Sequence, residues 1–69
     1  MLKEYAVVLL KRPTLAIPLP SGTKGTILIV HSSVPSAFEV EFVDREGKSL
    51  GTYTVEEDDL EELKLTDNL

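Results

Sequence analysis

The chain has 69 residues and a net charge of −5, with twelve acidic residues, seven basic ones, a single histidine and no cysteine. This length allows one domain, and the composition excludes disulfides and zinc sites built on cysteine or on several histidines. The acidic excess repels phosphate backbones, so nucleic acid is disfavoured as a partner. We expect a protein without a metal or another cofactor.

The first apolar run, Tyr5–Lys11, is rich in Val and Leu and predicts a strand, because Pro13 stops the run before it reaches the length of a helix. It is also much shorter than the roughly 20 residues that a membrane helix needs, and it lacks the cleavage site of a signal peptide. With no membrane segment and no cysteine, the expected compartment is the cytoplasm.

A proline-rich loop is predicted over residues 12–25, where three alternating apolar side chains could tuck beneath the chain: Leu15, Ile17 and Leu19. Gly22 and Gly25 in this loop lack the spacing of a phosphate-binding motif, and a strand rather than a helix follows them. We expect a turn and a close backbone approach there.

The rest of the chain predicts further strands and the connections between them. The first half consists of a strand at Thr26–His31, a turn at Ser32–Ser36, a strand at Ala37–Val43 and a tight connection at Asp44–Lys48 with Gly47 at positive φ. The second half consists of a strand at Ser49–Val55, a single 3₁₀ turn at Glu56–Asp59, a short closing strand within Leu60–Leu65 and a frayed tail at 66–69.

Short strands at roughly ten-residue spacing are typical of a small, strongly bent antiparallel barrel. The prediction is an all-β fold, a small SH3-like barrel of about five short antiparallel strands with one 3₁₀ turn, in a single domain over residues 1–65. An OB-fold is the alternative, but it needs a helix between the third and fourth strands, for which there is no room. The predicted core is Val7, Leu9, Ile27, Ile29, Phe38, Val40, Phe42, Tyr53, Val55 and Leu60. In the first two strands both parities are apolar, so the choice between them is open.

Three segments, "LPSGTKGTILIV", "AFEVEFVDREGKSL" and "DDLEEL", together with Val7–Leu10, resemble a family of small bacterial and cyanobacterial domains of unknown function. The resemblance extends over roughly residues 5–63. It implies an SH3-like, KOW-like barrel, and members of such families are often encoded beside toxin-type proteins, which implies an antitoxin or partner-binding role. It supplies no catalytic residues. The longer stretch at Thr14–Pro20 departs from the family pattern.

Glu39 and Glu41 lie about 7 Å apart if they share one face of a strand, which is within the range for the carboxylates of an inverting glycosidase. Catalysis also needs a cleft and a carboxyl with a raised pKa, so we interpret the pair as the solvated face opposite Phe38, Val40 and Phe42. His31 and Ser32 are adjacent on a strand and point to opposite faces, so they do not form a Ser–His catalytic arrangement, and we interpret His31 as a surface or rim histidine. A small hydrolase is therefore the third hypothesis.

The basic residues could form a patch for nucleic acid on a KOW-like barrel, but they are scattered along the chain and alternate with acids: Lys3, Lys11, Arg12, Lys24, Arg45 and Lys48. By contrast, seven of the twelve acidic residues fall within residues 56–69. An acidic segment of this kind can steer a basic protein partner.

The two-faced apolarity of the first two strands predicts an exposed apolar patch, and such patches mark interaction sites. The predicted interaction surface combines one parity of these strands with the acidic segment: Val8, Leu10, Leu28, Val30, Asp58, Asp59, Glu61 and Glu62. The leading hypothesis is a non-enzymatic protein-interaction module that associates with a protein partner or with itself, with no small-molecule substrate. A KOW-like nucleic-acid-binding module is the alternative.

Overall fold

In the part of the chain that the structure describes, the fold consists of five antiparallel strands and one 3₁₀ turn, as predicted. The computed structural model describes residues 2–31 and 37–63, so the predicted turn at 32–36 and the predicted tail at 66–69 lie outside the described residues. The elements in chain order are β1 (Val7–Leu10), β2 (Lys24–His31), β3 (Ala37–Val43), β4 (Ser49–Glu56), η1 (Glu57–Asp59) and β5 (Leu60–Glu62).

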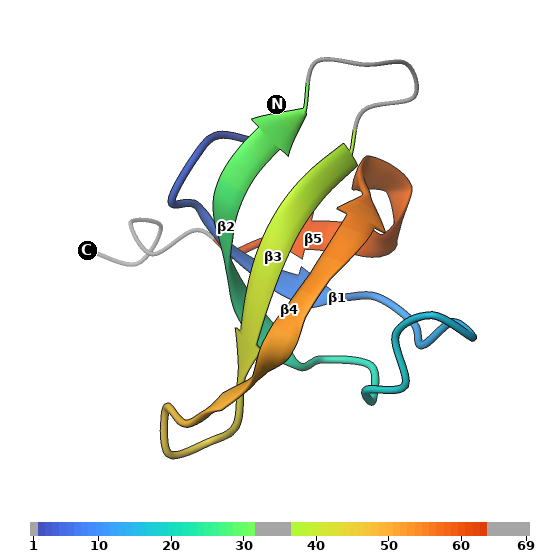
Figure 1. The fold of residues 1–69 in the computed structure, drawn as a ribbon. Helices are drawn as coiled ribbons and strands as arrows, with labels where there is room; N and C mark the ends of the chain where they lie inside the picture. Colours follow the sequence, from blue (N-terminus) through green and yellow to red (C-terminus); the bar gives the residue numbers. More distant parts are fainter. Residues whose placement is uncertain (1, 32–36, 64–69) are drawn as a thin grey trace.

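The strands form one sheet in the order β4-β3-β2-β1-β5. β2 is the strand around which the sheet bends, because its first half pairs with β1 while the strand as a whole pairs with β3. As a result, β1 and β5 run across behind β3 and β4 in Figure 1. The bend lets a short chain close around one core, which a flat sheet of this size cannot do.

The inner face of β3 is the centre of the core. Phe38, Val40 and Phe42 are each at most 2% exposed, which confirms the alternation predicted for this strand. Within residues 2–31 and 37–63, the buried apolar residues are Leu2, Val8, Leu10, Ile17, Ile27, Phe38, Val40, Phe42, Val55 and Leu60. Tyr53 is half-buried and packs against this core, with its ring tilted 52° to that of Phe42 at a centroid distance of 6.1 Å.

The core face of β1 is the reverse of the predicted one. Val8 and Leu10 are 0% and 1% exposed, whereas Val7 and Leu9, which were expected in the core, are half-buried on the outer face. Val8 stands opposite Gly25 in the ladder. Because β1 is apolar on both parities, its sequence carries no signal for this choice.

β2 changes face at a bulge, and this makes the prediction wrong for Ile29. Ile27 pairs with Val40 and is fully buried, but the next pairing is Ile29 with Glu39, so Leu28 is an extra residue in the ladder. The extra residue turns Ile29 onto the outer face, where it is 50% exposed. Strict alternation along the sequence cannot reveal such an insertion.

Two core residues come from outside the strands. Leu2 and Ile17 are 8% and 3% exposed, and Ile17 enters the core from the proline-rich loop. Of the three alternating side chains in that loop, Ile17 is buried and Leu19 half-buried, whereas Leu15 is completely exposed. The loop is thus partly anchored, as predicted, but only through its second and third apolar residues.

Candidate interaction surface

The second half of β2, Leu28–His31, is an edge of the sheet and is called here the free half of β2. β1 pairs with β2 only at Lys24, Gly25 and Thr26. Ile27 adds main-chain hydrogen bonds to Tyr5 and Ala6, of 2.7 and 3.0 Å. Beyond Ile27, the described part of the chain places only β3 in the ladder with β2. An unpaired edge offers its N–H and C=O groups to another strand.

The free half of β2 carries apolar side chains that are open to solvent. Ile29 is 50% exposed and Val30 is 43% exposed, while Leu28 at the bulge is half-buried. Natural proteins usually protect free edges with charges or prolines, whereas this one carries adjacent branched apolar residues. An exposed apolar edge of this kind is suited to pairing with another protein chain.

A small polar network lies beside Ile29 on the outer face. Nε2 of His31 and Oε2 of Glu39 are 3.0 Å apart, and the hydroxyl of Thr54 donates a hydrogen bond of 2.6 Å to the same Oε2. The network joins β2, β3 and β4 across the sheet. The side chain of His31 is 42% exposed, so the prediction of a surface histidine is confirmed.

The network lowers the pKa of Glu39. The hydrogen bond from Thr54 contributes most and the one from His31 comes next, because both stabilise the ionised carboxylate. A general acid in a glycosidase needs the opposite shift. In this network Glu39 therefore links neighbouring strands through hydrogen bonds and is not poised to act as a proton donor. The hydroxyl of Thr54 contacts the carboxylate and not the imidazole, so it is not arranged as an activated nucleophile either.

Sequence reasoning missed this network, although one signal pointed to it. His31 and Glu39 lie on either side of a short predicted turn. A hairpin at this turn would place the two side chains close together if both point to the outer face. The bulge at Leu28 conceals which parity of β2 is the outer one, so the contact could not be derived without the register.

The structure separates the predicted interaction surface into several parts. Val8 and Leu10 are core residues, so their predicted exposure is wrong. Leu28 and Val30 belong to the free half of β2. The predicted acids are found in η1 and on β5: Asp58, Asp59, Glu61 and Glu62.

The acids do not share one environment. Asp59 is half-buried and accepts a hydrogen bond of 3.1 Å from Nε of Arg12. Glu61 and Glu62 are exposed on β5, two strands away from the first half of β2. Glu57 and Asp58 are exposed in η1, directly after the end of β4. The register aligns that end of β4 with the free half of β2, because His31 pairs with Ala37 and Ala37 with Glu56.

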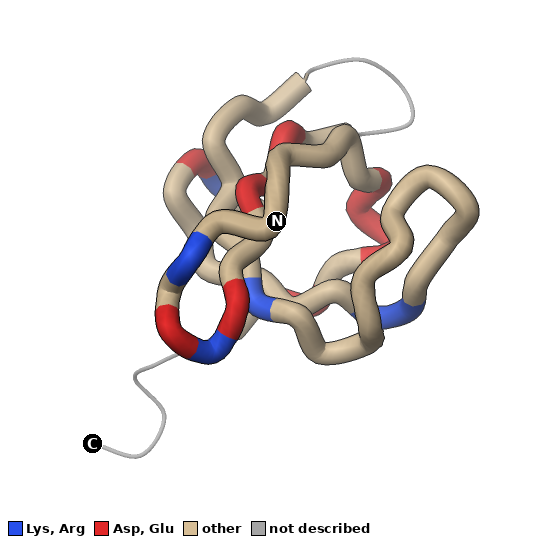
Figure 2. Tube along the Cα trace, turned by 60° about the horizontal axis from the view of Figure 1, so that its bottom comes forward, with Lys and Arg blue, Asp and Glu red and all other residues tan. Residues whose placement is uncertain are grey.

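Basic residues do not gather on one face. Figure 2 shows the lysines and arginines dispersed around the chain trace, with acids between them in the Asp44–Lys48 hairpin. Arg12 is already paired with Asp59. A focused electropositive stripe, which nucleic-acid binding needs, is therefore not formed by the basic residues that the structure describes.

Metal binding and membrane insertion can also be assessed for the residues that the structure describes. Across 2–31 and 37–63, histidines and carboxylates nowhere come together in a group of three or more that could hold a metal ion. No helix in these ranges has the length and apolarity to cross a membrane.

Comparison with known proteins places the chain in a family. A family model described as "Domain of unknown function (DUF4926)" matches residues 4–62, which run from just before β1 to the last residue of β5. No curated protein and no solved structure matches the chain. Since the match extends over well more than half of the sequence, the chain belongs to this family of small domains of unknown function.

Proposed function

We propose that this protein is a non-enzymatic protein-interaction module that binds a protein partner through the free half of β2. The observation that carries the proposal is a strand edge that no described strand pairs with, combined with the exposed side chains of Ile29 and Val30. An extended segment of the partner adds to this edge by main-chain hydrogen bonds, and its apolar side chains cover Ile29 and Val30.

The charge of the module favours a basic partner. Glu56, Glu57 and Asp58 are exposed at the end of the sheet where the free half of β2 lies. In the described residues, none of them is within 4.0 Å of a basic group. Unpaired surface acids accelerate the association of a basic protein by long-range attraction, and this effect weakens with salt.

The class of partner follows from the resemblance of the sequence to domains encoded beside toxin-type proteins. We assign the module the role of an antitoxin or accessory partner in the bacterial cytoplasm, built on an SH3-like barrel. The topology supports the barrel, because a bent β2 is shared between a β5-β1 layer and a β3-β4 layer. A basic, RNA-cleaving toxin fits the acidic charge of this module.

Affinity capture with matched variants tests the proposal. The tagged protein is compared with an Ile29→Asp/Val30→Asp variant, and the captured proteins are quantified by mass spectrometry. Leu15→Asp is the control, because Leu15 is a fully exposed leucine in the loop; it receives one negative charge where the double variant receives two. We expect at least one protein to be depleted about tenfold or more by the double variant and retained by Leu15→Asp.

Charge reversal tests the steering separately. Glu57→Lys/Asp58→Lys should weaken capture of the same protein at low salt, whereas Glu4→Lys, a reversal at another exposed acid, should leave it unchanged. Equal capture by all variants would refute the proposed surface. Recovery of RNA in place of a protein would favour the KOW-like alternative, and dimerisation of the wild type that Ile29→Asp/Val30→Asp abolishes would make a second copy the partner.

A further inference from the structure

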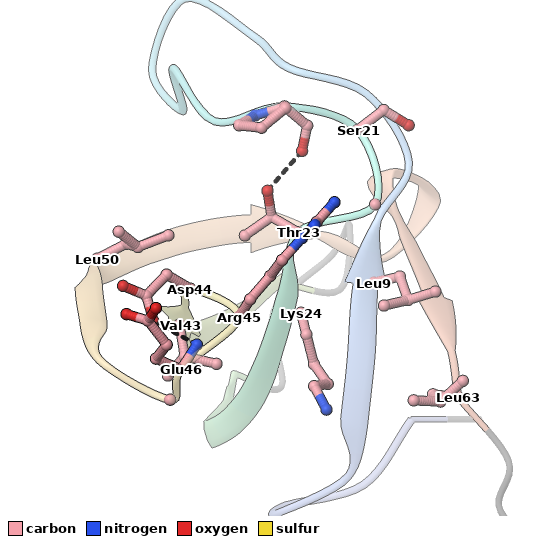
Figure 3. A pocket seen from close by; sticks show the side chains of 13 residues that line it. Leu9, Ser21, Thr23, Lys24, Val43, Asp44, Arg45, Glu46, Leu50 and Leu63 are labelled. Atoms are coloured by element: carbon pink, nitrogen blue, oxygen red, sulfur yellow. Dashed lines mark hydrogen bonds between the residues drawn. The ribbon is translucent and has the colours of Figure 1, made fainter.

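A groove distinct from the free half of β2 opens on the outer face near the other end of the β2–β3 ladder. Its floor is the row in which Lys24 pairs with Leu9 on one side and with Val43 on the other. Leu63 extends the wall beyond Leu9, and Leu50 extends it beyond Val43. Figure 3 shows Lys24 between Leu9 and Val43, with Leu63 beside Leu9. These residues, together with Arg45, are called the Lys24 groove.

The walls of the groove are apolar and accessible. Leu9, Val43 and Leu63 are half-buried on the outer face, and Leu50 is 40% exposed. Leu50 owes its position to a register shift, because Phe42 pairs with Gly51 and Val43 with Ser49, which leaves Leu50 as an extra residue. A second irregularity of the ladder thus turns another apolar side chain outward.

Two basic side chains, Lys24 and Arg45, line the groove. Lys24 and Arg45 are exposed, and within residues 2–31 and 37–63 neither lies within 4.0 Å of a carboxylate. The carboxylate of Asp44 is occupied within its hairpin, because one of its oxygens accepts 2.9 Å hydrogen bonds from the N–H groups of Glu46 and Lys48. Glu46 lies on the hairpin rim, and Glu61 lies across Leu9 from Lys24. Cations at the centre are therefore flanked by acids.

Both rims of the groove are held by hydrogen bonds before any ligand arrives. On the loop side, the N–H of Gly22 donates to the carbonyl of Leu10 at 2.7 Å, and the hydroxyl of Thr23 donates to the carbonyl of Pro20, also at 2.7 Å. On the hairpin side, the N–H of Gly47 donates to the carbonyl of Asp44 at 3.0 Å. A site ordered in advance loses less conformational entropy on binding.

We propose that the Lys24 groove binds an extended acidic peptide segment of a protein partner. The segment places acidic side chains against Lys24 and Arg45, and its apolar side chains pack on Leu9 and Val43. Charge complementarity selects this occupant, because the central cations lack partners in the described residues. Single-stranded nucleic acid fits less well, since the lining holds no aromatic ring on which a base could stack.

The proposal gives the module a second contact with the opposite charge preference to the first. It does not depend on the free half of β2, since the two surfaces use different residues of β2. A partner with a basic surface and an acidic peptide segment could engage both surfaces at once, and two contacts on one partner multiply its apparent affinity.

Selection from a random peptide library tests the proposal. A library of twelve-residue peptides is selected on the immobilised wild-type protein, and the pool is then bound to Lys24→Glu/Arg45→Glu and to Lys3→Glu. Lys3 is the control, because it is exposed and does not line the groove. We expect enrichment of peptides with Asp or Glu between apolar residues, unchanged binding to Lys3→Glu, and an affinity at least tenfold lower for the double variant.

Nuclear magnetic resonance then locates the selected peptide. The amide shifts of Leu9, Lys24 and Val43 should change on titration, while the core shifts of the double variant should match those of the wild type. The proposal is overturned by a pool without acidic enrichment, by equal binding to the double variant, by shift changes confined to another surface, or by tighter binding of a uridine oligonucleotide at the same residues. None of these outcomes bears on binding at Ile29 and Val30, so the two proposals fail separately.

Discussion

Gly25 shows how one missing side chain positions the core. A Cβ atom at this position would lie 2.7 Å from Cγ1 of Val40, 2.9 Å from Cδ1 of Phe42 and 3.0 Å from the carbonyl oxygen of Glu41. The first two contacts are with side chains that are fully buried. Side chains in a tightly packed interior can shift only slightly to make room for another atom. The absence of a side chain at Gly25 is therefore what lets β2 approach β3 closely.

Gly25→Ala is therefore expected to destabilise the domain by about 1–3 kcal/mol through overpacking. Urea unfolding followed by circular dichroism measures the change in the free energy of unfolding. Gly47→Asn is the comparison, because Gly47 has φ +84° and a Cβ atom there would meet nothing within 4 Å, and asparagine tolerates that conformation. A loss at Gly25 no larger than the loss at Gly47 would show that the strands are not in close contact there.

Glu39 makes stability depend on pH in a defined direction. Its pKa in the folded protein lies below the ordinary value of 4.5, chiefly because of Thr54 and then His31. The carboxylate therefore contributes stability that is fully present above the unfolded-state pKa and is lost as the pH falls through the folded-state pKa. Thr54→Val should raise the pKa of Glu39 toward its ordinary value and reduce this acid-dependent part.

The carboxyl carbon shift of Glu39, followed by nuclear magnetic resonance across an acid titration, measures this change. Thr52→Val provides the control, because Thr52 occupies the same face of β4 but stands opposite Glu41. The assignment of the network fails if the two variants give the same titration curve for Glu39.

At the level of single residues, sequence patterns predicted well where one parity is polar. β3 has charged residues on its outer parity, so the burial of Phe38, Val40 and Phe42 could be read directly. The positive φ of Gly47 and the close approach at Gly25 also followed from their surroundings. Leu2 had no such signal, because its burial depends on where a chain end packs and not on any local period.

At the level of whole elements, covered and uncovered positions of the strands have very different tolerance of charge. Val40 is fully buried at the centre of β3, while Val30 is 43% exposed on the free half of β2. Val40→Asp should unfold the domain, because an unpaired buried charge costs several kcal/mol and a chain of this size has a stability of only about 3–10 kcal/mol.

Val30→Asp serves as the matched substitution and should change the free energy of unfolding by less than about 1 kcal/mol. Thermal unfolding followed by circular dichroism distinguishes the two variants. A cooperative transition at the normal temperature for Val40→Asp would contradict the inside and outside assignment of β3 and with it the register of the sheet.

The strands themselves could be predicted, but their irregularities could not. β3 has the predicted bounds, and β2 and β4 differ from the predicted ones only at their ends. The register shifts at Leu28 and Leu50 change which face a residue occupies, and an extra residue of this kind bends its strand. This is why Ile29 was assigned to the core and why the exposed leucine of the Lys24 groove was not foreseen.

At the scale of the whole molecule, one bent sheet carries both the free half of β2 and the Lys24 groove. The acidic segment and part of the apolar surface could be inferred from composition and alternation. Their arrangement could not, because the sequence does not show that β5 pairs with β1 at one end of the sheet while η1 follows β4 at the other. The free half of β2 exists because β1 is four residues long while β2 has eight, a difference that the sequence did not show.

The most direct test of the central claim is hydrogen–deuterium exchange on the protein alone and in complex with the partner that affinity capture identifies. We predict that those amides of Leu28–His31 that are not hydrogen-bonded to β3 exchange rapidly in the free protein, because the described part of the chain pairs this half-strand on one side only. In the complex they should become strongly protected. Unchanged exchange at Leu28–His31 in a saturated complex would contradict the claim that the free half of β2 is the binding edge.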